Sequence, residues 1–373
     1  MPRRPFARVP ALALAALLLL AIPAHAADPG RWRQVGASTI SFRYWQGLSS
    51  DLVPRLFFTG IRQGVYRTDA ALVQQAGTDD AIPADVHQRE GYNHIGDPSW
   101  DAAGGGRVLL PLECYDDRLG NTCGTGAFGV ADPDTLAWRF YVKLDPGEIR
   151  KAMWVEASPD GRLAWTSSGD DLLAYRLAAV RPGNASPGHP PIHSVRRLRG
   201  AVPPSGITGA AFWRGRLLLA GQQGASFQVW SVNTRTGARR LEIERTINGE
   251  AEGIDVTPAL GGLLQWGVMP LSKTGPATYP QPTLLTFTPA PAPQLRVRAP
   301  LLVRAGRRVA IPVRVVTGPG EPIGVATVRL GAASSVSSKD GRAMLHVRLR
   351  RGAHRITAAL PGTRPGAALI LAR

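Results

Sequence analysis

The stretch W-V-E-A-S-P-D-G-R-L-A-W-T-S-S-G, residues 154–169, sets two short apolar segments on either side of a polar turn. The turn, S-P-D-G at 158–161, ends in Asp-Gly, a pair that accepts the positive φ angles favoured in tight β-hairpins. The flanking segments are too short for helices and are largely apolar, as expected for strands buried on both faces. This stretch therefore predicts a β-hairpin with two buried strands.

Degenerate copies of the same unit recur along the chain. They occupy residues 52–60, 96–112, 154–169, 209–221 and 253–267. A third strand follows several copies, as in D-L-L-A-Y-R-L at 171–177, and a fourth follows in L-A-W-R-F-Y-V-K-L at 136–144. Repeats of about 40 to 50 residues that each form a four-stranded sheet are typical of a β-propeller. We predict an all-β protein with five blades; the segment 27–51 leaves room for a sixth, and a two-sheet sandwich is the alternative.

The motifs S-P-D-G-R-L-A-W at 158–165 and A-E-G-I-D-V at 251–256 resemble secreted bacterial β-propellers of the lactonase-like and NHL-like type. The resemblance covers residues 27–288. In calcium-dependent lactonase-like members it implies an inner-strand Glu that joins Asp and Asn oxygens around a hard cation. The matching residues are Glu252, Asp97 and Asn93. Thr208 stands where a further acidic ligand would be expected, so calcium is compatible with the sequence but not required by it.

A second unit begins after a Pro/Ala linker at 289–293. Residues 294–373 alternate with period two in R-R-V-A-I-P-V-R-V-V at 307–316 and R-A-M-L-H-V-R-L at 342–349. Short alternating strands in a unit of this size indicate a β-sandwich. With its D-G-R-A turn at 340–343, this region resembles bacterial Ig-like domains, so we expect a basic Ig-like β-sandwich.

The two units differ in net charge. The formal net charge is +17, and residues 294–373 hold fourteen Arg, one Lys, one Asp and one Glu, or +13. A strongly basic face favours an anionic surface; the alternative is a solvated face in a chain generally rich in Arg. Nucleic acid is not expected, because few aromatic residues interleave with the arginines for base stacking. The predicted anionic-surface contacts are Arg296, Arg298, Arg314, Arg329, Arg348 and Arg350.

The N-terminus predicts export. Residues 1–26 combine three arginines, an apolar run at 9–22 and an A-H-A cleavage signal at 24–26, the layout of a signal peptide. We expect a periplasmic or extracellular protein with no transmembrane segment after cleavage. Cys114 and Cys123 are the only cysteines and do not form a C-x-x-C motif, so one disulfide is expected.

Polar residues at the starts of the expected inner strands are the candidate ligand-binding site, because propellers bind ligands at the channel mouth. A general base would be His94 or one of the carboxylates; no catalytic residue is assigned, since G-x-S-x-G and H-E-x-x-H motifs are absent. The role of Glu113 in the site is left undecided, because its strand could carry it to a blade end. The candidates are Asn93, His94, Asp97, Lys151, Glu156, Thr208, Glu250 and Glu252.

These features favour a binding or scaffold protein of the cell envelope, rather than an enzyme, with the basic domain as anchor. Its partner would be an envelope component or a glycan. One alternative is a lactonase or other hydrolase that acts at the channel mouth, with or without calcium. Another is a glycan-binding adhesin in which Tyr92 and Trp100 stack on a sugar ring.

Overall fold

The computed structural model describes residues 31–373, except 54, 103–105, 272–274, 291–292, 319, 321, 339 and 361–362. The signal-peptide prediction for 1–26 and part of the linker at 289–293 lie outside these residues. The described chain is almost entirely β, with one α-helix, α1 (Ala84–Glu90), and short 3-10 turns at Leu177–Ala179, Pro182–Asn184 and Pro258–Leu260. Within it, no helix combines the length and the apolar character needed to cross a bilayer.

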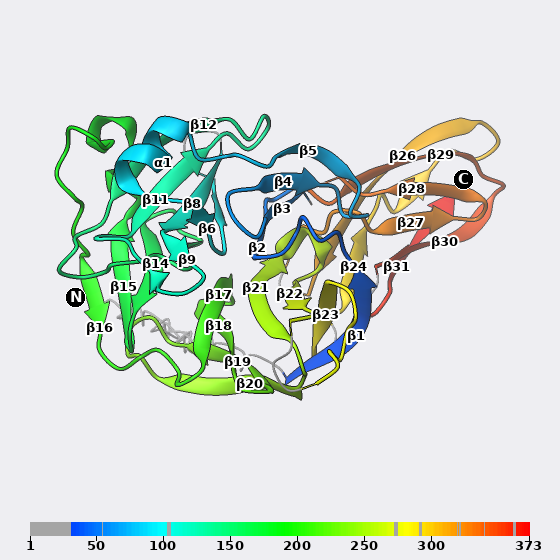
Figure 1. Ribbon diagram of the computed structural model, residues 1–373. Coiled ribbons are helices and arrows are strands. Elements are labelled where there is room, and N and C mark those ends of the chain that lie inside the picture. Colours follow the sequence, from blue (N-terminus) through cyan, green and yellow to red (C-terminus); the bar gives the residue numbers. More distant parts are fainter. Residues whose placement is uncertain are drawn as a thin grey trace, which may run out of the picture.

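Five antiparallel sheets follow one another around a ring (Figure 1). The first contains β2 (Gly47–Ser50), β3 (Leu56–Thr59), β4 (Val65–Thr68) and β5 (Gln74–Thr78). The second contains β6 (His94–Ile95), β7 (Ser99–Asp101), β8 (Arg107–Glu113), β11 (Ala127–Ala131) and β12 (Trp138–Lys143). The third contains β13 (Glu156–Ala157), β14 (Leu163–Ser168), β15 (Asp171–Arg176) and β16 (Arg196–Leu198). The fourth contains β17 (Gly206–Trp213), β18 (Arg216–Gln223), β19 (Ser226–Val232) and β20 (Arg239–Thr246).

The fifth sheet joins the two ends of this region. It contains β21 (Glu250–Thr257), β22 (Leu263–Met269), β23 (Thr283–Ala290) and, as its outermost strand, β1 (Arg31–Thr39). In Figure 1 the blue β1 lies beside the yellow β23, with which it pairs in antiparallel register. In the described part of the segment expected to leave room for a sixth blade, residues 31–51, β1 completes the fifth sheet and β2 opens the first.

The innermost strands contact one another in cyclic order: β2, β7, β13, β17, β21 and again β2. In each sheet the strands follow one another from the centre of the ring to its outside, and the sheets close the ring. This is the predicted β-propeller architecture. Inner strands such as β3 and β22 are buried along their whole length, which explains their nearly continuous apolar sequences. Large side chains such as Trp154, Trp165 and Trp266 fill the space between sheets.

The S-P-D-G hairpin forms between β13 and β14. Ser158 and Leu163 face each other across it, with the Ser158 amide bonded to the Leu163 carbonyl at 2.7 Å. Gly161 takes the positive φ angle, +67°, and is the residue of the turn that does so. The Asp160 side chain instead accepts a hydrogen bond from the Ser158 hydroxyl at 2.6 Å. Both residues of the motif thus serve the turn, in different ways.

The C-terminal residues form two further sheets that project to one side of the ring (Figure 1). One contains β24 (Leu295–Arg298), β26 (Arg308–Thr317) and β29 (Arg342–Arg348). The other contains β25 (Leu302–Val303), β31 (Gly366–Ala372), β30 (Gly352–Ala359), β27 (Thr327–Leu330) and β28 (Ala333–Val336). Ile311 and Leu345 of the first sheet share a buried cluster with Val328 and Ile356 of the second. The two sheets therefore enclose one core.

Candidate functional site

Asp97 lies on the axis of the propeller and links the inner strands. Its backbone NH donates to the carbonyl of Met153 at 3.0 Å, and its carbonyl accepts from Val155 at 3.1 Å. Its carboxylate accepts hydrogen bonds from the backbone amides of Leu48 at 2.7 Å and Ala210 at 2.9 Å. One residue of the second sheet therefore ties together strands of the first, third and fourth sheets.

Three glycines make this convergence possible. A Cβ atom on Gly253 would lie 2.1 Å from Oδ1 of Asp97, and one on Gly209 would lie 2.8 Å from Oδ2. A Cβ on Gly47 would lie 2.6 Å from the Cα of Asp97. The backbones approach so closely that no side chain fits, and the Asp97 side chain is fully buried. Burial raises the pKa of Asp97 well above its usual value, and nearby Glu156 adds to the effect.

Two more carboxyl groups lie further along the inner strands, Asp255 buried and Glu156 partly exposed. Glu156 accepts hydrogen bonds from the Ser99 hydroxyl at 2.7 Å and the Phe212 amide at 2.8 Å, and burial raises its pKa to about 8. Asp255 accepts from the Ser50 hydroxyl, and burial raises its pKa to about 6. These hydrogen bonds join neighbouring inner strands, so the two residues act within the propeller interior.

The start of β21 brings Glu252 to the other side of Asp97. Glu252 is 4% exposed, and Nε2 of Gln46 donates to its Oε1 at 3.4 Å. The Thr208 hydroxyl donates to the backbone carbonyl of Glu252 at 3.3 Å. Burial raises the pKa of Glu252 well above its usual value, with further contributions from the negative charges of neighbouring carboxylates, Glu113 among them. Burial therefore favours the neutral form of the Glu252 carboxyl group.

His94 and Glu113 form a close pair beside Glu252. They face each other in the pairing of β6 with β8, and Nδ1 of His94 lies 2.8 Å from Oε1 of Glu113. Both side chains are buried, and the His94 ring contacts the Tyr115 ring with centroids 5.5 Å apart. A pocket of about 220 Å³ opens beside His94. Glu113 and Glu252 are not among its lining residues, which are Arg62, Asn93, His94, Tyr115, Asp116 and Asp117. Sequence reasoning left Glu113 unassigned, because its partner becomes visible only when the strand register is known.

The predicted site residues do not form one cluster. Thr208 bonds to Glu252, whose pKa the charge of Asp97 helps to raise, whereas His94 pairs with Glu113 at the pocket of about 220 Å³. Glu156 bonds to Ser99 and Phe212, and the charge of Asp255 helps to raise its pKa. Glu250 begins β21 and is near enough to raise the pKa of Glu252. Lys151 is exposed in another pocket, of about 770 Å³, between the third and fourth sheets.

The three oxygens expected around calcium are not brought together. Both oxygens of Asp97 are occupied by backbone amides in the closely packed axis. The Asn93 side chain is turned to Tyr115, donating to its carbonyl at 2.9 Å and accepting from its amide at 2.7 Å. As arranged, Asn93, Asp97 and Glu252 do not fit a shared cation, and no step is assigned to one.

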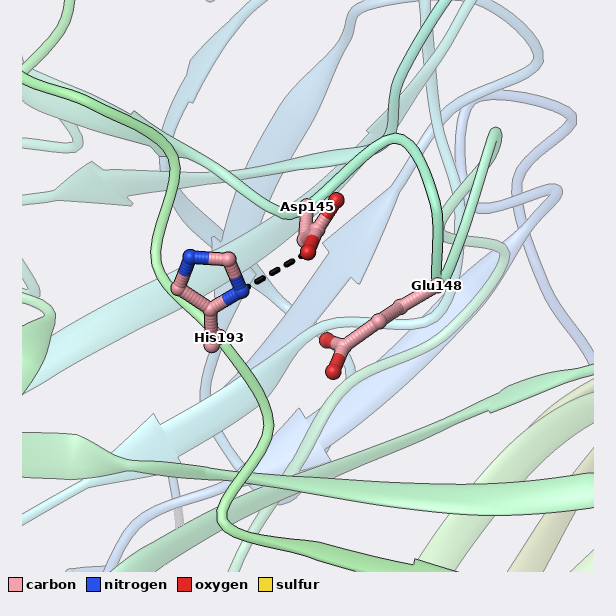
Figure 2. A group of neighbouring side chains, drawn as sticks. All are labelled: Asp145, Glu148 and His193. Atoms are coloured by element: carbon pink, nitrogen blue, oxygen red, sulfur yellow. Dashed lines mark ion pairs between the residues drawn. The ribbon is translucent and has the colours of Figure 1, made fainter.

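A different cluster meets the geometric requirement for metal ligands. Within the described residues, Asp145, Glu148 and His193 are the one group of three such side chains with ligand atoms within 4.8 Å of one another (Figure 2). Nδ1 of His193 lies 2.7 Å from Oδ2 of Asp145. Glu148 accepts hydrogen bonds from Ser194, through its amide and its hydroxyl, and from the Tyr175 hydroxyl. These contacts tie the loop after β12 to the loop before β16.

The two aromatic residues expected to stack on a sugar differ in burial. Tyr92 is 1% exposed, and its hydroxyl donates to the Thr125 carbonyl at 3.0 Å, so its ring is not accessible for stacking. Trp100 packs against the same apolar cluster as Tyr92 but is only partly buried. The two rings therefore do not form a shared stacking surface.

The predicted disulfide between Cys114 and Cys123 is confirmed. It closes a loop between β8 and β11 that carries a small hairpin, β9 (Tyr115–Asp116) and β10 (Gly120–Asn121). Asp116 accepts hydrogen bonds from the backbone amides of the turn, as expected of a turn-forming residue. A disulfide is suited to an oxidising compartment.

No family model matches the chain, and no curated protein is similar to it in sequence. Similar solved structures include glutaminyl cyclase from Myxococcus xanthus, with 12% identity, a TM-score of 0.44, and coverage of 70% of this chain and 97% of that one. A luciferin-regenerating enzyme has 13% identity and a TM-score of 0.44, covering 68% and 95%. A gluconolactonase from Xanthomonas campestris has 15% identity and a TM-score of 0.37, covering 70% and 95%.

The prediction of a scaffold rather than an enzyme is wrong, since these similar structures are enzymes. With TM-scores below 0.5, they transfer no reaction and no residue to this chain. The function is therefore argued from the side chains of this protein.

Proposed function

We propose that the protein is a hydrolase that acts at the mouth of the propeller channel, with His94 as general base. The observation that carries this proposal is the buried pair of His94 and Glu113, with Nδ1 and Oε1 2.8 Å apart, at the wall of an open pocket. The contact is a close charge pair and not a hydrogen bond, since Nδ1 of His94 has no hydrogen-bond partner among the described residues. The nearby carboxylate favours a proton on Nδ1, which leaves the other ring nitrogen to accept a proton.

Glu252 supplies the complementary acid. Its pKa is raised well above the usual value by burial first and by neighbouring carboxylates second. A carboxyl group in its neutral form can donate a hydrogen bond to an oxygen on which negative charge develops.

The reaction that fits this pair is hydrolysis of a carboxylic ester, of which a lactone is the cyclic case. Nε2 of His94 takes a proton from water as the water oxygen adds to the carbonyl carbon. Glu252 donates a hydrogen bond to the carbonyl oxygen as it becomes an oxyanion. When the ester C–O bond breaks, the imidazolium returns its proton to the leaving oxygen, which restores His94 for another cycle.

The proposal places this site in an exported protein with two units. Residues 27–288 would be a five-bladed propeller closed by β1, and 294–373 an Ig-like β-sandwich. Of the expected linker at 289–293, Pro289 and Ala290 belong to β23 and pair with β1. The layout of residues 1–26 and the disulfide between Cys114 and Cys123 support export. The pairing of β1 with β23 and the two sheets around one C-terminal core support the two units.

The test is turnover of a panel of lactones and aryl esters by the chain 27–373. His94→Gln should lower kcat by at least about a hundredfold, the usual size of a general-base contribution. Glu113→Gln should lower kcat less and shift the pH profile, because it weakens the orientation and basicity of the imidazole. His189→Gln, at an exposed position, is the matched control and should leave kcat unchanged.

Treatment with a chelator tests whether the reaction depends on calcium. We expect equal turnover before and after treatment with EDTA, because the His94 step uses no cation. Full activity of the His94→Gln variant, or hydrolysis that disappears with EDTA and returns with calcium, would contradict the proposed mechanism.

A further inference from the structure

Arginines of the C-terminal three-stranded sheet stand directly opposite one another. In the pairing of β24 with β26, Arg298 faces Arg314; in the pairing of β26 with β29, Arg314 faces Arg342 and Arg308 faces Arg348. All five side chains are exposed. We call these five residues the arginine face. It is the outer side of the sheet, since Ile311 and Leu345 of the same strands point into the core.

Cross-strand like charges are unfavourable, because residues directly opposite in an antiparallel pair have Cβ atoms about 5 Å apart. Little on the protein offsets this repulsion. Arg342 pairs with Asp340 at 3.0 Å, and Arg348 donates to the Gly306 carbonyl at 2.7 Å. Among the described residues, no carboxylate pairs with Arg298, Arg308 or Arg314. Residues 294–373 hold fifteen basic residues and two acidic ones, so the charge excess belongs to the whole region.

An apolar pocket lies between the arginines. Pro312 faces Met344 across β26 and β29, and this pair lies between the Arg308/Arg348 and Arg314/Arg342 pairs. Met344 is 46% exposed, and Val336 at the end of β28 is 58% exposed. A cavity of about 680 Å³ is lined by these apolar residues together with arginines of the face, among them Arg298, Pro300, Arg314 and Met344. The site therefore combines a cationic rim with an apolar floor.

The exposed apolar residues continue beyond the pocket. Leu301 is 73% exposed and Leu302 is 56% exposed, immediately after Pro300. A ligand that matches this surface must bring negative charge and hydrocarbon together. Phosphate headgroups with the adjoining acyl chains have that composition, and arginine is well suited to phosphate because its planar fork donates two parallel hydrogen bonds.

We propose that the arginine face and its apolar pocket dock on an anionic lipid surface. Residues 294–373 contain no Phe, Trp or Tyr, so neither sugar rings nor nucleobases would find an aromatic platform there. A purely polar polyanion would also leave Met344, Val336 and Leu301 in contact with water. Lipid is the one class of anionic partner that uses the charge and the apolar floor together.

The structure sorts the arginines expected to contact an anionic surface. Arg298, Arg314 and Arg348 belong to the arginine face, and Arg296 is exposed on the same strand as Arg298. Arg329 lies on β27 of the other sheet. Arg308 and Arg342 join the face although the sequence pattern did not single them out, because their membership depends on the register of β26 with β29.

The experiment measures binding of the chain 27–373 to vesicles of phosphatidylcholine, with and without phosphatidylglycerol. We expect binding to the mixed vesicles, release at high salt and little binding to phosphatidylcholine alone. Arg298→Gln with Arg314→Gln should weaken binding about thirtyfold, from the usual contribution of two basic side chains at an anionic membrane. Arg329→Gln with Arg355→Gln removes the same charge from exposed positions of the other sheet and is the matched control.

Equal losses in the two double variants would overturn the proposal, because net charge alone would then explain binding. Met344→Ser, which keeps every charge, should weaken vesicle binding severalfold through the lost apolar contact. Binding to heparin or to inorganic phosphate as strong as to the mixed vesicles, and unchanged by Met344→Ser, would replace the lipid proposal with a polyanion site. Melting curves of all variants separate lost binding from lost folding.

Discussion

The propeller and the C-terminal domain place their charged groups in opposite ways. The propeller turns carboxyl groups inward: Asp97, Glu252 and Asp255 are buried, Glu156 is partly exposed, and desolvation raises the pKa of each. The C-terminal domain keeps its arginines on the outside, even where they face one another across strands. A carboxylate can enter a protein interior because it can take up a proton and become neutral. Arginine remains charged at any physiological pH, so it stays in water or meets an anion.

The largest expected effect comes from filling the propeller axis. Gly253→Ala would put a Cβ atom 2.1 Å from Oδ1 of Asp97 and 2.5 Å from the Cα of Gly47. The Asp97 side chain is buried and held by two backbone amides, and the other neighbour is backbone, so neither can move aside easily. We expect a loss of more than about 4 kcal/mol or failure to fold. Gly36→Ala in β1, where the nearest atom would be 3.7 Å away, is the control. Equal urea unfolding midpoints for the two variants would contradict the close packing at the axis.

The next effect is a dependence of propeller stability on pH. Burial raises the pKa of Glu156 to about 8, whereas the unfolded chain has the ordinary value of 4.5. The folded state therefore binds more protons between these values, so stability falls as pH rises from 4.5 to 8 and stays low above that. Glu156→Gln should flatten this slope, by up to roughly 1.4 kcal/mol per pH unit. A slope that is the same in both proteins would exclude a protonated Glu156.

Removal of the disulfide should have a smaller effect that is confined to the propeller. Cys114→Ser with Cys123→Ser opens the loop between β8 and β11, and the chain-entropy model gives a loss of about 2.7 kcal/mol. Calorimetry of the chain 27–373 should show a lower melting temperature for the propeller only. Reduction of the native protein should reproduce the shift, and a shift of both units together would contradict their independence.

The smallest effect has the opposite sign. Arg314→Gln removes a charge that faces Arg298 on one side and Arg342 on the other, so the domain should become more stable by a few tenths of a kcal/mol at low salt. Arg329→Gln is the matched control, because Arg329 faces Ser334 and Thr357, which are neutral. Urea unfolding at low and high salt measures both. Loss of stability in Arg314→Gln would show that Arg314 has a favourable local contact.

Local sequence was sufficient for the repeating hairpins and for the disulfide. S-P-D-G at 158–161 predicts its turn because residues close in sequence determine a turn, and two cysteines leave one possible pairing. The wrong functional prediction concerned contacts between residues that are distant in sequence. The sequence pattern marked His94 and Glu252, but it could not show that Glu113 lies opposite His94 or that Asn93 turns to Tyr115.

The amino-acid sequence by itself determined the order of the hairpins along the chain, the cysteine bridge and the uneven distribution of charge, with +13 in residues 294–373. These follow from neighbouring residues and from counting. Only the tertiary structure decided that β1 completes the fifth sheet, that Asp97 joins strands from distant parts of the chain, and that Arg314 stands between two other arginines. Strand register and ring closure bring together residues far apart in sequence, and the pKa of a carboxyl group depends on the neighbours that this closure provides.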